Sequence, residues 1–182
     1  MKALHFSKIR DVKSPNRANE GDAGLDFYIP VLDESSIRAI AQNEEQMNLG
    51  NLRFKYDDLG KPYISLAPGC RVLIPSGIKV LIDPKESMLM AANKSGVATK
   101  RGLLYTAEIV DHPYTGEVHI GVFNSGAQDQ IISLTKGEKI IQFIHVPVIL
   151  STPLEISNET YEAMAKNWGT RGSNGFGSSD NK

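Results

Sequence analysis

The sequence predicts an all-β domain, a sandwich or a barrel, from two observations. Most of the chain after residue 50 consists of short apolar segments separated by Gly, Pro and Asn, which is the pattern of strands and turns. In one of these segments Val118, Ile120 and Val122 occupy every second position, and this period of two indicates a pleated strand with distinct faces. Many short strands with turns between them favour a sandwich or a barrel.

The strand pattern is clearest in three segments, residues 71–82, 116–126 and 139–150. We expect a single domain over residues 1–182, because a chain of this length can bury a core of its own.

Two segments depart from the strand pattern and predict helices. In residues 33–48, apolar side chains lie near helical spacing (Ile37, Ile40, Ala41 and Met47) behind three candidate N-caps, Asp33, Ser35 and Ser36. A short amphipathic helix is therefore expected. A second helical segment is expected over residues 158–167. Between the first helix and the main strands, Phe54 and Tyr56 alternate up to a turn at Leu59 and Gly60, which predicts a small hairpin.

Composition limits the partners and the cellular compartment that we expect for the protein. Lys plus Arg number 20 and Asp plus Glu number 21, without long runs of one sign, so we expect neither a nucleic-acid nor a membrane partner. Cys70 is the only cysteine and cannot form an internal disulfide, which favours a reducing compartment. We expect the cytoplasm, or the host-cell cytoplasm if the protein is viral.

The Gly/Ser-rich end of the chain, residues 169–182, allows two interpretations. Such a terminus is usually disordered, and by composition alone that interpretation is favoured. However, Arg171 can bind a phosphate in bidentate fashion, and Phe176 offers a flat apolar face for a base. An arm that closes over a nucleotide needs these side chains.

Three other segments carry candidate site residues. Asp111 lies just before a turn with Tyr114, where a carboxylate can either cap the turn or activate water. Residues 93–103 are rich in cations and hydroxyls but lack a P-loop pattern, so a turn with solvated lysines is the ordinary interpretation. Gln142 is the one polar side chain in the apolar run 140–144, and a buried amide there needs a partner.

Taken in order, five segments resemble the five motifs of the trimeric dUTPase family, and their order and spacing are more specific than any single motif. The segments are DAGLDFY (22–28), KSGVATKRGL (94–103), IVDHPYTGEV (109–118), KGEKIIQF (136–143) and RGSNGFGSS (171–179). The resemblance covers about residues 20–30 and 66–182.

The resemblance implies a jelly-roll-like β-clip subunit and a homotrimer whose active sites are each assembled from three chains. It implies hydrolysis of dUTP to dUMP and pyrophosphate with Mg²⁺, which removes dUTP and supplies dUMP for dTTP synthesis. Asp111 would activate the water that attacks the α-phosphorus, and Asp26 would hold Mg²⁺ through water. Tyr114 would pack under the deoxyribose, and Phe176 would stack on uracil. The implied substrate-binding residues are Lys94, Ser95, Gly96, Tyr114, Gln142, Arg171, Phe176, Gly177 and Ser178.

Three features depart from the family pattern. Lys94 stands where the family usually has Arg, which keeps the charge but loses the planar fork. Glu108 stands where the family usually has Gly, and a carboxylate there can alter base recognition. Residues 33–62, the expected helix and hairpin, resemble an insertion that can serve a protein partner.

Other functions stay open at this point. A pyrophosphatase that takes dCTP as well as dUTP is one alternative, and a non-catalytic nucleotide sensor on the same scaffold is another. dCTP deaminases have a related third motif, but they use a catalytic Glu at the position of Gly121. A capsid-like jelly roll would explain the strands but not the clustered phosphate-binding residue types.

Overall fold

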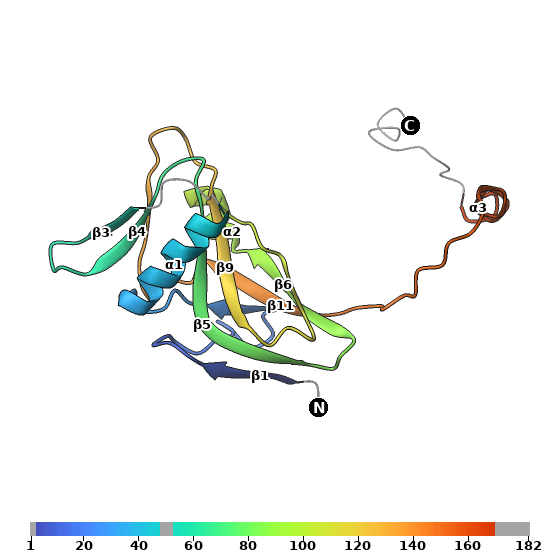
Figure 1. Ribbon diagram of the computed structural model, residues 1–182, viewed down its shortest axis with the longest axis horizontal. Coiled ribbons are helices and arrows are strands. Elements are labelled where there is room, and N and C mark those ends of the chain that lie inside the picture. Colours follow the sequence, from blue (N-terminus) through green and yellow to red (C-terminus); the bar gives the residue numbers. More distant parts are fainter. Residues whose placement is uncertain (1–2, 48–52, 170–182) are drawn as a thin grey trace. The chain divides into compact units, whose positions relative to one another are not determined.

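The computed structural model describes residues 3–47 and 53–169 and shows a mostly β chain, which confirms the predicted fold class (Figure 1). The strands are β1 (Ala3–Lys8), β2 (Gly24–Phe27), β3 (Arg53–Tyr56), β4 (Pro62–Leu66), β5 (Arg71–Asp83), β6 (Ser87–Asn93), β7 (Leu103–Tyr105), β8 (Ile109–Asp111), β9 (Glu117–Asn124), β10 (Ile132–Leu134) and β11 (Ile141–Pro147). The helices are α1 (Glu34–Met47), α2 (Ser95–Arg101) and α3 (Asn158–Ala165).

The strands form three antiparallel sheets within the described ranges. Their orders are β1-β5-β9-β7, β10-β4-β3 and β2-β11-β6-β8. The long strand β5 runs beside β9, and their register shifts between Pro75 and Lys79, where β5 carries an irregularity. The predicted strands at 71–82, 116–126 and 139–150 correspond to β5, β9 and β11.

The core follows from the period of two along each strand. Val118, Ile120 and Val122 of β9 are all buried, as their alternation predicts. On β2 and β11 the same alternation sends Phe27 and Phe143 into the core, where their ring centroids lie 4.6 Å apart. The neighbouring positions on these two strands therefore face the opposite side of the sheet, and these are the positions of the site.

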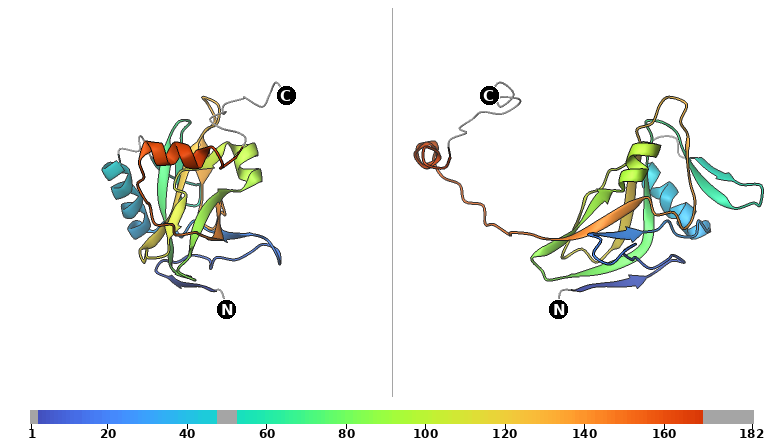
Figure 2. Two further views of the ribbon diagram at one scale, coloured as in Figure 1. Left: turned by 90° about the vertical axis from the view of Figure 1, so that its right-hand side faces the viewer. Right: turned by 180° about the vertical axis from the view of Figure 1, so that it is seen from behind.

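Helix α1 confirms the helix predicted over 33–48. Asp33 caps it, because the Ser36 amide donates to Asp33 Oδ1 at 2.8 Å. Ile40 is buried against the body of the domain, and the side-chain amide of Asn43 donates to the Leu73 carbonyl of β5 at 3.2 Å. Figure 2 shows α1 beside β5 in both views.

The hairpin of β3 and β4 is confirmed as well. Its turn is held by Asp57, whose Oδ1 accepts from the amides of Leu59 and Lys61, and Gly60 takes a left-handed φ of 70° there. Strand β4, the second strand of the hairpin, ends at Leu66. Because β4 also pairs with β10, the second strand of the hairpin belongs to the core.

The chain divides at Leu150 into two units, and residues 150–169 are the described part of the second unit. Within the described part of it, α3 confirms the helix predicted over 158–167, and Ser157 caps α3 by accepting from the Thr160 amide at 3.2 Å. None of the helices in the described ranges is long and apolar enough to cross a membrane.

Candidate active site

Asp26 and Gln142 occupy directly opposed positions on the neighbouring strands β2 and β11. Their neighbours Phe27 and Phe143 point into the core, so Asp26 and Gln142 share the other face of the sheet. Two of the predicted site residues, 116 positions apart in sequence, are thus brought together by strand register.

Asp26 is the centre of an ion cluster. Its carboxylate is only 3% exposed and accepts from two ammonium groups, Lys94 at Oδ1 and Lys139 at Oδ2, the latter at 2.8 Å. Burial raises the pKa of Asp26, but the hydrogen bonds from Lys139 and Lys94 outweigh it, so the pKa lies below its ordinary value. Two cations around one carboxylate leave a surplus positive charge, which favours an anionic ligand.

Gln142 has the partner that a half-buried amide needs. Its Nε2 donates to the Asn93 carbonyl at 2.9 Å, at the end of β6 and just before Lys94. Its Oε1 lies over Gly24, where an added Cβ would come within 2.1 Å of that oxygen. Gly24 therefore makes the space in which the Gln142 side chain lies beside Lys94 and Asp26.

Substituting Gly24 with alanine should displace Gln142 and lower the kcat/KM of the enzyme by about tenfold. The loss of stability should be small, because the displaced atoms lie at the end of a flexible side chain. Steady-state kinetics of Gly24→Ala, Gln142→Ala and the double variant check this. The two effects should not add, because both act on one side chain. Additive effects would contradict the steric explanation.

Residues 95–101 form helix α2, whereas the ordinary interpretation of that segment was a turn. The helix ends at Gly102, whose φ of 65° is left-handed and whose amide donates to the Ala98 carbonyl at 3.1 Å. Arg101 fixes the same end by an ion pair with Glu138 at 2.7 Å. The predicted residues Ser95 and Gly96 lie in the first turn, directly after Lys94. The signal that sequence reasoning missed was Gly102 behind two basic residues, a helix-stop pattern.

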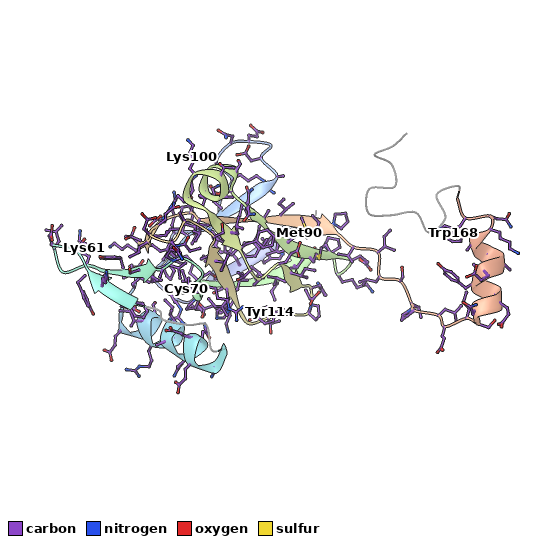
Figure 3. All side chains as sticks on the ribbon, turned by 90° about the horizontal axis from the view of Figure 1, so that it is seen from above. Lys61, Cys70, Met90, Lys100, Tyr114 and Trp168 are labelled. Atoms are coloured by element: carbon purple, nitrogen blue, oxygen red, sulfur yellow. The ribbon has the colours of Figure 1, made fainter. Side chains whose placement is uncertain are left out.

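Asp111 ends β8 and begins a tight turn that carries Tyr114 (Figure 3). The Tyr114 amide donates to the Asp111 carbonyl at 3.0 Å, and the Tyr114 hydroxyl donates to the Glu117 carbonyl at 2.8 Å. Gly116 lies under the ring, where a Cβ would come within 2.5 Å of Tyr114 Cζ. The ring is thus fixed across the turn but remains 43% exposed.

The Asp111 carboxylate is exposed and has no hydrogen-bond or ion-pair partner within residues 3–47 and 53–169. The interpretation of Asp111 as a turn cap would require its side chain to accept from the turn. Only its backbone carbonyl does so. A free carboxylate beside a fixed aromatic ring can accept a proton from water.

Glu108 lies in the irregular stretch between β7 and β8. Its carbonyl accepts from the Ala91 amide at 2.6 Å, and its exposed side chain accepts from the Tyr105 hydroxyl at 3.4 Å. The backbone of this stretch is fixed, because the Thr106 amide donates to the Gly121 carbonyl at 3.0 Å.

Within one chain, Asp111 and the Asp26 cluster lie at different places on the same sheet. Asp111 pairs with Met88 of β6, whereas Gln142 pairs with Ala92, four positions further along that strand. Four residues of strand span roughly 13 Å, and Asp111 and Asp26 also lie on opposite edge strands of this sheet. One phosphate group cannot contact both carboxylates of the same chain.

The remaining predicted residues, Arg171, Phe176, Gly177 and Ser178, lie outside the described residues. One residue that sequence reasoning did not single out is Lys139, the second cation on Asp26. Its only signal was its place in the segment KGEK before Gln142.

The described residues contain no group of three or more His, Cys, Asp or Glu side chains that could hold a metal ion by themselves. A magnesium ion needs six oxygen ligands and commonly takes most of them from substrate phosphates and water. One buried carboxylate at an anion-attracting cluster fits that mode of binding, and Asp26 is the residue that would hold the ion.

Comparison with known proteins gives a consistent result. A model of the dUTPase family matches residues 57–180, more than half of the chain. The deoxyuridine 5'-triphosphate nucleotidohydrolase of Legionella pneumophila is 32% identical over 95% of this chain and 91% of its own length, and that of Bartonella bacilliformis is 31% identical over 92% and 82%.

Solved structures have the same fold. The dUTPase of Staphylococcus bacteriophage 80alpha with dUpNHpp matches with a TM-score of 0.69 at 20% identity, covering 98% of this chain and 98% of that one. A mutant dUTPase of the S. aureus phage phi11, which coordinates a structural Mg(II) ion, matches with a TM-score of 0.60 at 18% identity, covering 86% and 97%. By its family model and its relatives, this chain belongs to the dUTPase family.

Proposed function

We propose that this chain is a dUTP diphosphatase, which hydrolyses dUTP to dUMP and pyrophosphate as a homotrimer with shared active sites. The observation that carries the proposal is the free Asp111 carboxylate at the start of the turn that holds the ring of Tyr114, in a chain of the dUTPase family. The product dUMP is the precursor of dTTP, so the reaction both removes dUTP and supplies that synthesis.

Asp111 acts as the general base. It takes a proton from a water molecule, and the water oxygen attacks the α-phosphorus while pyrophosphate leaves. The negative charge that grows on the leaving group is met by Lys94, Gln142 and, as a further cation, Lys139. By the resemblance to the family, Arg171 would add a further cation and Phe176 would offer an apolar face for the base; both lie outside the described residues.

When bound, Mg²⁺ would neutralise charge on the triphosphate, and Asp26 would hold it through water. The chain itself provides Asp26 in ionised form, because two lysines keep its pKa low. Lys94 and Lys139 remain beside the carboxylate as donors to phosphate oxygens.

Sharing of sites between chains is supported by the separation within one chain. Asp111 and the Asp26 cluster lie too far apart on their sheet to meet one phosphate group. A site with both must therefore take Asp111 from one chain and the cluster from another. Cytoplasmic location and a protein partner at residues 33–62 stay predictions.

A deaminase is disfavoured by the packing at Gly121. A Cβ at this position would lie 2.6 Å from Thr106 Oγ1 and 3.2 Å from the Ala107 amide nitrogen. The chain thus has no carboxylate where the dCTP deaminases use a catalytic Glu, and a side chain there would require the Thr106 hydroxyl and Ala107 to give way. A sensor without catalysis is disfavoured because it needs no free carboxylate at Asp111.

Glu108→Gly is expected to raise the preference for dUTP over dCTP by about tenfold, because it removes a carboxylate at a position where the family usually has Gly and where a charge can alter base recognition. The measurement is the ratio of kcat/KM for the two nucleotides. Tyr105→Phe is the matched control, because it removes the Tyr105 hydroxyl contact but keeps the carboxylate. An unchanged ratio in Glu108→Gly would exclude Glu108 from base selection.

Product analysis tests the function itself. Purified protein with Mg²⁺ is incubated separately with dUTP, dCTP, dTTP and UTP, and both pyrophosphate and the remaining nucleotide are identified. Pyrophosphate and dUMP from dUTP are the expected result. Ammonia release from dCTP would establish a deaminase, and no turnover of any nucleotide would favour the sensor.

A further inference from the structure

Arg10 forms an ion pair with Glu117, a residue 107 positions away at the start of β9. Arg10 Nε donates to Glu117 Oε1 at 2.8 Å, and Nη2 donates to Oε2 at 3.1 Å. The two side chains are only 16% and 13% exposed. A bidentate pair with little solvent access fixes both the distance and the orientation of the two groups.

The same carboxylate also holds the irregular part of β5. Glu117 Oε1 accepts from the Gly77 amide at 2.6 Å, where the register between β5 and β9 shifts. Gly77 has a φ of 76°, and a Cβ there would come within 2.9 Å of Arg10 Cβ. This position therefore requires glycine, and Glu117 ties three separate segments of the chain together.

Glu117 then connects this arrangement to Tyr114. The carbonyl of Glu117 accepts from the Tyr114 hydroxyl at 2.8 Å and from His119 Nδ1 at 2.9 Å. A Cβ at Gly116 would overlap the Tyr114 ring, and the hydroxyl of the ring is bonded to the Glu117 carbonyl. The position of the Glu117 backbone therefore helps to decide where the ring lies. No group of the ion pair itself needs to touch the nucleotide.

We propose that Arg10 and Glu117 are positioning residues that set the sugar selectivity of the enzyme by holding the ring of Tyr114 in place. The inference rests on the proposed function and on the packing of Tyr114 under the deoxyribose that the resemblance to the family implies. A ring held there would leave no room for a 2′-hydroxyl. When the pair is lost, the start of β9 and the ring can move, and the ribose of UTP gains access.

The test compares kcat/KM for dUTP and for UTP in the full-length protein and in Arg10→Lys, Arg10→Ala and Glu117→Gln. Arg10→Ala should lower the dUTP/UTP selectivity by about tenfold, mainly through faster turnover of UTP. Arg10→Lys should fall between wild type and Arg10→Ala, because lysine keeps the charge but not both hydrogen bonds. Glu117→Gln, which keeps an acceptor for Gly77, should also lower the selectivity.

Arg38→Ala is the matched control. It removes another Arg–Glu pair, Arg38 with Glu34 at 2.7 Å, which is exposed on α1 and far from the turn in sequence. Its selectivity should equal that of wild type.

If Arg10 had a purely structural role, its loss would lower the yield of folded protein or lower the turnover of dUTP and UTP equally. An unchanged dUTP/UTP selectivity in Arg10→Ala would therefore overturn the inference. If Arg10→Ala does not fold, the dUTP/UTP selectivities of Arg10→Lys and Glu117→Gln test the inference in the same way. A wild-type protein that does not hydrolyse dUTP would overturn the proposed function. Equal selectivity of all variants in an active enzyme would overturn only the inference.

Discussion

Replacing Asp111 with asparagine is expected to lower the rate of dUTP hydrolysis by roughly 10³- to 10⁴-fold. This loss is the upper range for the removal of a general base. Asparagine has nearly the same shape but cannot accept the proton of the attacking water. The Asp111 side chain has no partner in the described residues, so the substitution breaks no contact of the fold there. The variant should therefore fold normally and still bind a non-hydrolysable dUTP analogue.

Single-turnover kinetics with Mg²⁺ measure this rate apart from product release, and calorimetry measures binding of the analogue. Asp129→Asn is the control, since it makes the same chemical change at an exposed position before β10. It should keep the wild-type rate. Turnover of Asp111→Asn within tenfold of wild type would remove Asp111 as the base.

Phe143→Ala should lower the free energy of unfolding by about 3–5 kcal/mol, the usual cost of deleting a buried aromatic ring. The Phe143 side chain is 1% exposed and its ring is tilted by 56° against that of Phe27. Phe143 also sits between Gln142 and Ile144 on β11, so a loosened strand would displace the amide that contacts Asn93. We therefore expect lower activity at temperatures where the variant is still folded.

Phe6→Ala is the matched control, because it removes the same ring from a position that is 44% exposed on β1. Phe6→Ala should lower the free energy of unfolding by less than about 1 kcal/mol. Denaturant unfolding must be compared at one protein concentration, since assembly of chains contributes to apparent stability. Equal losses for the two variants would show that the Phe27 and Phe143 contact does not hold this sheet together.

The fold was predictable from the sequence where periodicity is strong. Strict alternation identified β9, and Asp33 with Ile37 and Ile40 identified α1. Helix α2 was missed because its seven residues contain a glycine and two β-branched residues, so local propensity is weak. The C-terminal end of α2 is capped by Gly102, which has a left-handed φ, and is held by the ion pair of Arg101 with Glu138. Local sequence does not reveal that ion pair.

The site was predictable in its residue types but not in its arrangement. Family motifs pointed to Asp26, Lys94 and Gln142, yet no motif showed that Lys139 would share the Asp26 carboxylate from 113 positions away. That contact depends on the register of β2 against β11, which tertiary packing sets. The same holds for Arg10 and Glu117, because their pairing requires the shifted register between β5 and β9.

The distance between Asp111 and the Asp26 cluster along β6 has a genetic consequence. If a complete site takes each group from a different subunit, the single polypeptide is not the unit of function. Two alleles that are each inactive, one defective in Asp111 and the other in Gln142, would then complement each other in one cell. In randomly mixed assemblies some sites would receive an intact Asp111 from one chain and an intact cluster from another.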